Sequence, residues 1–375
     1  MSLSSKYKFG PTIVEITGDH PVADLIRSEY QSMAAAPEIK SQVIFNFIPE
    51  ITFQDPIVIK DVLLVDDQYM GRPFKSGFAF KINNDSLTNE IIKVDIAIEK
   101  RVIPSNFIKK IIYAGYYYWN WSHLTTTEIA AKNIIYGIFD AIIHQLMLAK
   151  GSVFCHAASI EKEGKAYILS GFGGSGKTGL SSELIFNRNF KFLSDDFALI
   201  SSNGKAYHYG KKAQIYAYNT ENNPLLYKNL MANRNLLDKL MWHFRKKYYG
   251  PKKVRRRMRP EDIFGKERIG KDSPIDGFYF LMRGKVNQPS YIDLSAEEIA
   301  QRNTSVIADE INYFLNLCDL WHAANYKAVP QRQILNQTFL VYKEILEKVR
   351  KKALIIFPKD YNPTEMADFF IQNIK

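Results

Sequence analysis

The 375-residue sequence has only two cysteines and no long uninterrupted apolar run. Cys155 and Cys318 are too few for a disulfide framework or a cysteine-based zinc site, which suits a reducing compartment. The best candidate for a membrane span, residues 129–148, contains Lys132 and Asp140, and its polar residues fall mostly on one side of a helical pattern. The first eight residues are polar, and no apolar stretch follows them, so no signal peptide is expected. These absences predict a cytoplasmic protein without a membrane span.

Acidic residues are fewer than basic residues. The chain has 39 Asp and Glu against 50 Lys and Arg, a formal net charge of +11 at pH 7, which favours an anionic partner or substrate. The length predicts two domains, and an apolar content of 46 % is ordinary for a globular protein. ATP would account for part of the excess positive charge, and nothing in the composition indicates an oligomeric state.

Residues 168–178 read ILSGFGGSGKT and contain the spacing G-x-x-x-x-G-K-[ST] of a phosphate-binding loop. The candidate nucleotide-binding residues are Gly171, Gly173, Gly174, Ser175, Gly176, Lys177 and Thr178. Glycines can adopt positive φ and lack a Cβ atom, so successive backbone N–H groups can turn toward phosphate oxygens. Lys177 would reach the β- and γ-phosphates of ATP, and Thr178 would offer its hydroxyl to Mg²⁺. An apolar strand at 166–169 before the loop and a helical pattern after it support this interpretation.

Residues 190–200 read FKFLSDDFALI and predict one apolar strand that contains two adjacent carboxylates, Asp195 and Asp196. Burying ionised carboxylates costs several kcal/mol each unless a cation compensates them. Mg²⁺ and the loop lysine would be such cations. One carboxylate could accept a proton from an acceptor hydroxyl while the other holds the metal or its water.

The region before the loop predicts a separate domain. Residues 1–124 are expected to form a β-rich accessory domain, with strands at 12–17, 43–47, 57–65, 78–82 and 91–98. Thr125 and Glu128 form a capping box, which predicts that a helix begins there and that a second domain spans 125–375. Within it, strands at 153–160 and 165–170 are separated by four residues, so we expect an antiparallel hairpin rather than the parallel βαβ entry of most phosphate-loop proteins.

Three features between 154 and 200 occur in the order found in one family: Cys155-His156-Ala157, the loop 171–178, and Leu193-Ser194-Asp195-Asp196. Over these roughly fifty residues the chain resembles the catalytic domain of HPr kinase/phosphorylase and its HPr-kinase-like relatives. The Glu-Ile-Arg-Gly-Leu-Gly segment of the bifunctional enzymes is missing, so reverse phosphorolysis, hexameric assembly and HPr as the substrate are not expected. The N-terminal domain and the C-terminal extension resemble the divergent branch, which includes kinases of free serine and of lasso-peptide precursors.

The resemblance implies a mixed α/β (α+β) fold related to phosphoenolpyruvate carboxykinase, with ATP and Mg²⁺ as cofactors. It implies transfer of the γ-phosphoryl group to a serine-type hydroxyl on a small molecule, peptide or protein. Asp195 would be the general base and Lys177 the phosphate clamp. Thr178 and Asp196 would lie at the metal, and His156 would sit beside the transferring phosphoryl group. On residue type alone His156 would be a structural strand histidine.

Two alternatives remain open from the residues: a phosphate-loop ATPase acting on nucleic acid, and a nucleotide-binding regulatory protein without turnover. No helicase or transporter signature follows the loop, so a nucleic-acid partner is not expected. The basic run 245–259 could bind nucleic acid phosphates, or it could be a loop, either solvated or closing over ATP phosphates or an acidic acceptor. Arg283, at the end of an expected strand 275–282, is a possible phosphate contact. Helices are expected at 306–321, 333–349 and 363–374, a strand at 353–357, and no catalytic residue among them.

Overall fold

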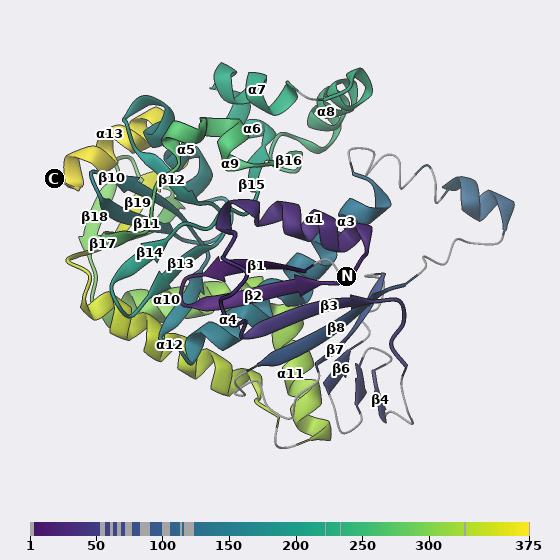
Figure 1. Ribbon diagram of the computed structural model, residues 1–375. Helices are drawn as coiled ribbons and strands as arrows, with labels where there is room; N and C mark the ends of the chain where they lie inside the picture. The colour runs from purple at the N-terminus through teal and green to yellow at the C-terminus, as the bar shows by residue number, and fades with distance from the viewer. Residues whose placement is uncertain are drawn as a thin grey trace. The chain divides into compact units, whose positions relative to one another are not determined.

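The computed structural model describes residues 4–52, 57–60, 63–65, 69–71, 77–82, 91–99, 106–112, 115, 124–221, 223–232, 234–325 and 328–374, and it is a mixed α/β structure (Figure 1). The chain forms two compact units. Unit 1 comprises Met1–Lys8, Thr12–Leu146 and Ile311–Gln331; unit 2 comprises Phe9–Pro11, Met147–Glu310 and Arg332–Lys375. The units therefore differ in extent from the expected domains 1–124 and 125–375, because residues 125–146 and 311–331 both belong to unit 1.

Unit 1 is built on a mixed sheet. Its strands are β1 (Ser4–Phe9), β2 (Thr12–Thr17), β3 (Val43–Ile48), β4 (Ile57–Ile59), β5 (Leu63–Val65), β6 (Tyr69–Gly71), β7 (Phe78–Ile82) and β8 (Ile92–Ile98), in the order β1-β2-β3-β8-β7-β6-β5-β4. The strand expected at 57–65 is thus two strands, β4 and β5, which pair antiparallel. Pairs β2–β3 and β3–β8 are parallel. Helix α1 (Pro21–Glu29) connects β2 to the sheet's next strand, as parallel neighbours require.

The helix that follows Thr125 packs within unit 1, which explains why the unit extends beyond residue 124. It consists of α3 (Thr126–Ile134), a π-helical turn (Ile135–Phe139) and α4 (Asp140–Leu148). Both hydrogen bonds of the predicted capping box between Thr125 and Glu128 are present. The ring of Phe139 stacks on Tyr30 with centroids 5.2 Å apart and contacts Phe45 at 4.3 Å. Its apolar stripe therefore contributes to this core. Helix α11 (Asn312–Ala324) also belongs to unit 1.

Unit 2 contains a nine-stranded sheet. Its strands are β9 (Ser152–Cys155), β10 (Ala157–Lys162), β11 (Lys165–Ser170), β12 (Lys191–Ser194), β13 (Ala198–Ser201), β14 (Lys205–Tyr207), β17 (Ser273–Gly284), β18 (Ser290–Asp293) and β19 (Lys351–Pro358). As predicted, β10 and β11 form an antiparallel hairpin. On its other side β11 pairs in parallel with β17, and β17 pairs in parallel with β19.

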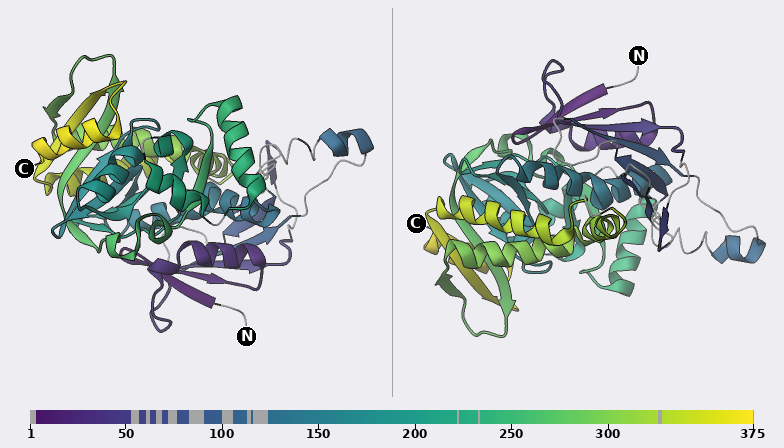
Figure 2. Two further views of the ribbon diagram at one scale, coloured as in Figure 1. Left: turned by 90° about the horizontal axis from the view of Figure 1, so that it is seen from above. Right: turned by 90° about the horizontal axis from the view of Figure 1, so that it is seen from below.

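Helices cover both faces of this sheet. On one face α5 (Lys177–Asn187) and α13 (Pro363–Asn373) pack on a core that includes Tyr279 and Leu281 of β17. The intervening Phe280 points to the opposite face and packs with Val306 of α10 (Ala296–Glu310). Helix α12 (Gln331–Glu347) runs beside α10 (Figure 2). Adjacent strand residues pointing to opposite faces give the long apolar strand β17 two buried sides.

A smaller group of elements stands at one edge of unit 2. It contains β15 (Ala213–Tyr216), α6 (Ala217–Glu221), α7 (Pro224–Met231), α8 (Leu236–Tyr249), β16 (Arg255–Met258) and α9 (Pro260–Phe264), and β15 pairs antiparallel with β16 (Figure 1). The prediction of a loop at 245–259 is therefore wrong. Residues 245–259 form the end of α8, a short turn and β16, and Arg245 and Arg256 among them are buried rather than solvated.

Besides the strand expected at 57–65, three further segments expected to be continuous are interrupted. The strand expected at 153–160 breaks at His156 into β9 and β10, and the strand expected at 190–200 breaks at 195–197 into β12 and β13. The helix expected at 306–321 breaks at Ile311 into α10 and α11. In the first two cases the interruption frees polar side chains from the strand ladder, which would otherwise point them into apolar layers. None of the helices in the described ranges meets the length and apolarity needed to cross a membrane.

Candidate functional site

The phosphate-binding loop lies between β11 and the first turn of α5, as the sequence predicts. Gly171, Gly174 and Gly176 have φ of +136°, +83° and +99°, whereas Gly173 does not need positive φ. A Cβ atom on Gly171 would collide with the backbone carbonyl oxygen of Leu281, and one on Gly176 would lie 2.9 Å from the side chain of Met366. The two glycines that frame the motif are thus required by both conformation and packing.

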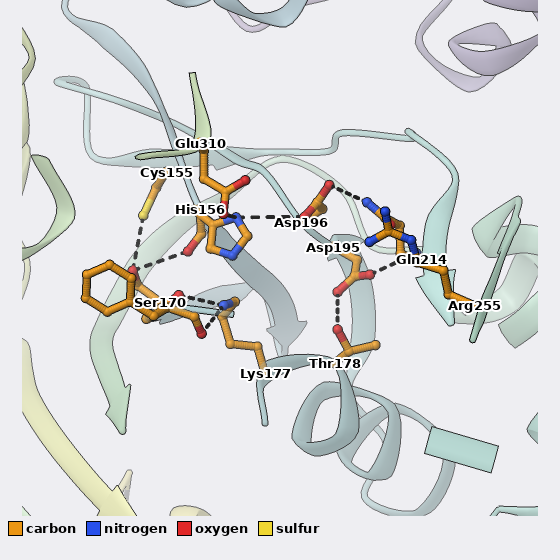
Figure 3. Close-up of polar contacts among 12 residues, drawn as sticks. Cys155, His156, Ser170, Lys177, Thr178, Asp195, Asp196, Gln214, Arg255 and Glu310 are labelled. Atoms are coloured by element: carbon orange, nitrogen blue, oxygen red, sulfur yellow. Dashed lines mark hydrogen bonds and ion pairs between the residues drawn. The ribbon is translucent and has the colours of Figure 1, made fainter. Parts of the chain in front are cut away.

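Lys177 folds back over this loop. Its Nζ donates to the carbonyl oxygens of Gly171 at 2.5 Å and Phe172 at 3.1 Å, so the loop holds the ammonium group before any ligand arrives (Figure 3). The side chain is buried, and burial lowers its pKa to about 8 although Asp196 and Asp195 oppose this shift. An anion in the loop would provide the compensating charge that the carbonyl groups supply only in part.

Thr178 meets the first of the paired aspartates. Its Oγ1 donates to Oδ1 of Asp195 at 2.9 Å, and the backbone N–H of Gln214 donates to Oδ2 of Asp195 at 3.3 Å (Figure 3). Burial and, to a smaller extent, the neighbouring Asp196 raise the pKa of Asp195 to about 6. The structure therefore brings the loop threonine and one carboxylate into direct contact.

Asp196 occupies different surroundings although it is the next residue. Its φ of +72° turns the backbone, so its carboxylate faces Nδ1 of His156 at 3.8 Å and accepts a hydrogen bond of 3.0 Å from Nε2 of Gln214. Burial opposes ionisation, but Lys211, His156 and the Gln214 hydrogen bond together lower the pKa of Asp196. One aspartate is thus held with a raised pKa and its neighbour is held ionised.

His156 lies at the break between β9 and β10 and is buried among charged groups. Besides Asp196, its Nδ1 approaches Oε1 of Glu310 at 3.4 Å (Figure 3). Burial lowers the pKa of His156 to about 4, and the charges of Lys177 and Lys211 lower it too. The imidazole is therefore neutral at pH 7, and a hydrogen-bonding role suits it better than that of a cation.

Three residues of this cluster are missing from the sequence-based set: Lys211, Gln214 and Glu310. Lys211 is fully buried with its Nζ 5.0 Å from the centroid of the Phe197 ring, and Gln214 contacts both aspartates. Glu310 ends α10, and burial, together with Asp196, raises its pKa to about 7. Neither Lys211 nor Gln214 belongs to a recognisable spacing motif. No sequence signal marks Glu310 either, because the expected helix 306–321 runs through it.

A cavity of about 570 Å³ opens above these groups. Its lining includes Gly173, Gly174, Gly176, Lys177, Thr178, His156, Asp195, Asp196, Gln214, Tyr216, Tyr218, Lys252, Arg283 and residues 359–363. Arg283 lines it, but its guanidinium donates to the carbonyl oxygens of Lys359 and Tyr361 at 2.8 Å each. Arg283 therefore holds the wall of the cavity in place. From the basic run, Lys252 is the residue that reaches the lining.

The donor set fits Mg²⁺ bound together with a nucleotide. Among the residues that the structure describes, no group of three or more His, Cys, Asp and Glu side chains is arranged to hold a metal ion. Thr178 and the two aspartates offer hard oxygen donors beside the loop, and Mg²⁺ commonly takes one or two protein oxygens and completes its shell with phosphates and water. A metal at this site would depend on phosphate oxygens.

Comparison with known proteins assigns no family. No family model matches the chain, and no curated protein is significantly similar to it. The resemblance of residues 154–200 to HPr-kinase-like proteins thus rests on the sequence motifs alone.

Proposed function

We propose that this protein is an ATP- and Mg²⁺-dependent kinase that transfers the γ-phosphoryl group to a hydroxyl acceptor, with a catalytic unit of the phosphoenolpyruvate carboxykinase-related, HPr-kinase-like type. The observation that carries the proposal is the contact between Thr178 and Asp195 at the end of the phosphate-binding loop, 2.9 Å long. This contact joins the residue type that binds Mg²⁺ to a carboxylate in the same cavity as Lys177. A glycine-rich turn without a nucleotide function would not require it.

In the proposed reaction the residues of the cluster have separate chemical roles. The acceptor oxygen attacks the γ-phosphorus, the bond from that phosphorus to the bridging oxygen of ADP breaks, and the acceptor proton passes to Asp195. A carboxylate with a pKa of about 6 can accept a proton near neutral pH. Lys177 would stabilise the charge that develops on the phosphoryl oxygens. Bound Mg²⁺ would neutralise phosphate charge, with Thr178 and the ionised Asp196 as its protein partners.

The activity is tested by incubation with γ-labelled ATP, Mg²⁺ and a panel of acceptors: serine, short serine peptides, sugars and DNA. Label on an acceptor supports a kinase. Release of free phosphate without transfer would indicate the alternative, a phosphate-loop ATPase, and binding without either product would indicate a regulatory nucleotide-binding protein. Lys177→Ala should abolish transfer by removing a charge from the transition state.

The two aspartates are distinguished by titration with Mg²⁺. Asp195→Asn should leave ATP binding intact and lower kcat by about 10²-fold or more, because the proton acceptor is lost. Asp196→Asn should instead raise the Mg²⁺ concentration needed for half-maximal activity. Because Asp195 contacts Thr178, the reverse pattern would exchange the two roles and leave the kinase proposal standing.

A further inference from the structure

Helix α8 exposes an apolar face to solvent. Leu236, Leu240, Phe244 and Tyr248 follow one another at intervals of four residues, and their exposed fractions are 74 %, 48 %, 60 % and 73 %. Leu237, on the same side, is 49 % exposed. Residues four apart lie on one face of a helix, so these five side chains form a continuous stripe, here called the α8 stripe. A contiguous exposed apolar surface of this kind is typical of an interaction site.

The opposite face of α8 is anchored in unit 2. Asp238 and Trp242 are buried on it, and both contact the buried Arg256 of β16. The guanidinium of Arg256 is 2.5 Å from Oδ1 of Asp238 and 5.2 Å from the Trp242 ring. The exposure of the stripe is therefore not the result of a loosely attached helix, because the other side makes a buried ion pair and an aromatic contact.

The anchored face connects α8 to the candidate site. Strand β16 pairs with β15, and Arg255 of β16 donates to the hydroxyl of Tyr216 at 2.6 Å. Tyr216 lines the cavity, and Gln214 in the same strand contacts both aspartates. At its C-terminal end α8 leads within three residues to Lys252, which also lines the cavity. Tyr248, the last residue of the stripe, is thus four residues along the chain from a residue of the cavity lining.

The charge beside the stripe is positive. Lys247 lies within the helical face of the stripe, and Lys252 and Lys253 follow in the next turn; all three are exposed. Apolar contacts flanked by exposed lysines are complementary to a surface that alternates apolar and acidic residues. A 14-residue helix is about 20 Å long, which exceeds the reach of a small-molecule acceptor.

We infer that the α8 stripe docks the phosphoryl acceptor as a polypeptide, through a segment rich in acidic and apolar residues whose hydroxyl-bearing part enters the cavity past Lys252. The inference rests on the proposed function, because it identifies the class of acceptor for that site. Docking and chemistry are separate steps, so they can be measured separately.

The docking test uses a fluorescein-labelled 20-residue peptide of repeated Glu and Leu with one Ser near its end, and the full-length protein without nucleotide. The double variant Leu240→Ser/Phe244→Ser removes two side chains of the stripe that are already exposed. The control is Leu340→Ser, because Leu340 is a similarly exposed leucine, at 53 %, on helix α12. Fluorescence anisotropy should show binding to the wild type and the control, and at least about tenfold weaker binding to the double variant. A peptide with Lys in place of Glu should not bind.

Several outcomes would overturn the inference. Equal binding of the peptide to the double variant and the wild type would show that docking does not use the stripe. Loss of self-association in the double variant would identify a second copy of the chain as the occupant. Stripe-dependent binding to phosphatidylglycerol vesicles without peptide binding would identify a lipid surface. Transfer of label from ATP is assayed separately, with this peptide and with the acceptor panel above. Peptide docking with no transfer to any acceptor would refute the kinase proposal alone, and transfer to the peptide that is insensitive to the double substitution would refute the docking site alone.

Discussion

Asp195 and Asp196 should respond in opposite ways to the same substitution. In the nucleotide-free protein at pH 7.5, we expect Asp195→Asn to raise the free energy of unfolding and Asp196→Asn to lower it. Asparagine has almost the shape of aspartate but carries no charge, so the comparison isolates the cost of holding each carboxylate ionised. It also tolerates the left-handed conformation of Asp196, whose φ is +72°, so backbone strain does not enter.

The magnitude for Asp195 follows from its pKa, which rises from 3.8 to about 6, first because of burial and then because of Asp196. The native state therefore binds this proton more tightly than the unfolded chain does, and stability is lost as pH rises through this interval. A shift of about two units costs about 3 kcal/mol above pH 7. Asparagine can still accept the Thr178 hydrogen bond but loses the one from Gln214, a loss of about 1 kcal/mol. The net gain is about 2 kcal/mol at pH 7.5 and disappears between pH 6 and pH 4.

The sign for Asp196 is the opposite. Burial opposes its ionisation, but Lys211, His156, the Gln214 hydrogen bond and Lys177 together outweigh burial and lower its pKa below the ordinary value. Its contribution to stability is therefore present above the unfolded pKa and is lost as pH falls through the native one. Removing this charge also leaves the buried ammonium of Lys211 with less compensation. We expect a loss of about 2 kcal/mol or more at pH 7.5.

Urea denaturation in EDTA, without nucleotide, at several pH values between 4 and 7.5 measures both effects, provided that the m-values of the variants match the wild type. The reasoning would be refuted if Asp195→Asn were less stable than the wild type at pH 7.5. It would equally be refuted if the gain did not diminish as the pH is lowered.

Three further predictions concern single residues. Gly171→Ala should destabilise the protein by about 3 kcal/mol or more, since the new Cβ would collide with a backbone carbonyl oxygen. Gly164→Ala, also at positive φ but with open space around it, should cost only about 1 kcal/mol. Equal losses in denaturation midpoints would contradict this prediction. Arg256→Ala should lower the unfolding free energy by about 3 kcal/mol, because it leaves the buried carboxylate of Asp238 with only a longer ion pair, of 3.6 Å, to Arg234. Arg255→Ala, on the same strand but partly exposed, should cost less than about 1 kcal/mol; similar losses would argue against the buried pair. Glu310→Gln should remove an inflection near pH 7 from the pH profile of kcat/KM. Burial and Asp196 raise the pKa of Glu310 to about 7, and glutamine does not titrate. An unchanged profile would exclude a role for the proton of Glu310.

The parts of the site that the sequence predicts well are those encoded within a few residues. The loop from Gly171 to Thr178 combines glycines, lysine and threonine at fixed spacing, and a strand before it and a helix after it form as expected. The hairpin of β10 and β11 follows from a connection too short for a parallel crossover. Local chemistry and chain length decide these features.

The parts that the sequence does not predict depend on contacts between distant segments. Glu310 is more than 100 positions away from His156, and in the sequence it is one of two adjacent acidic residues within the expected helix 306–321. Lys211 is buried although a basic residue next to another one normally indicates exposure, and its burial follows from Asp196 and the Phe197 ring. The extent of unit 1 also depends on distant segments. Residues 311–331 belong to unit 1, although residues 147–310 before them belong to unit 2.

The interruption at 195–197 explains how two adjacent acids acquire different chemistry. In a continuous strand Asp195 and Asp196 would point to opposite faces of the sheet, and one of them would be buried in an apolar layer. The left-handed conformation of Asp196 ends the strand instead and keeps both carboxylates at the same cavity, one on Thr178 and the other facing His156. The strain of that conformation, of the order of 1 kcal/mol, is small beside the cost of an uncompensated buried charge. A backbone irregularity at this point is therefore what allows one carboxylate to have a raised pKa while its neighbour remains ionised.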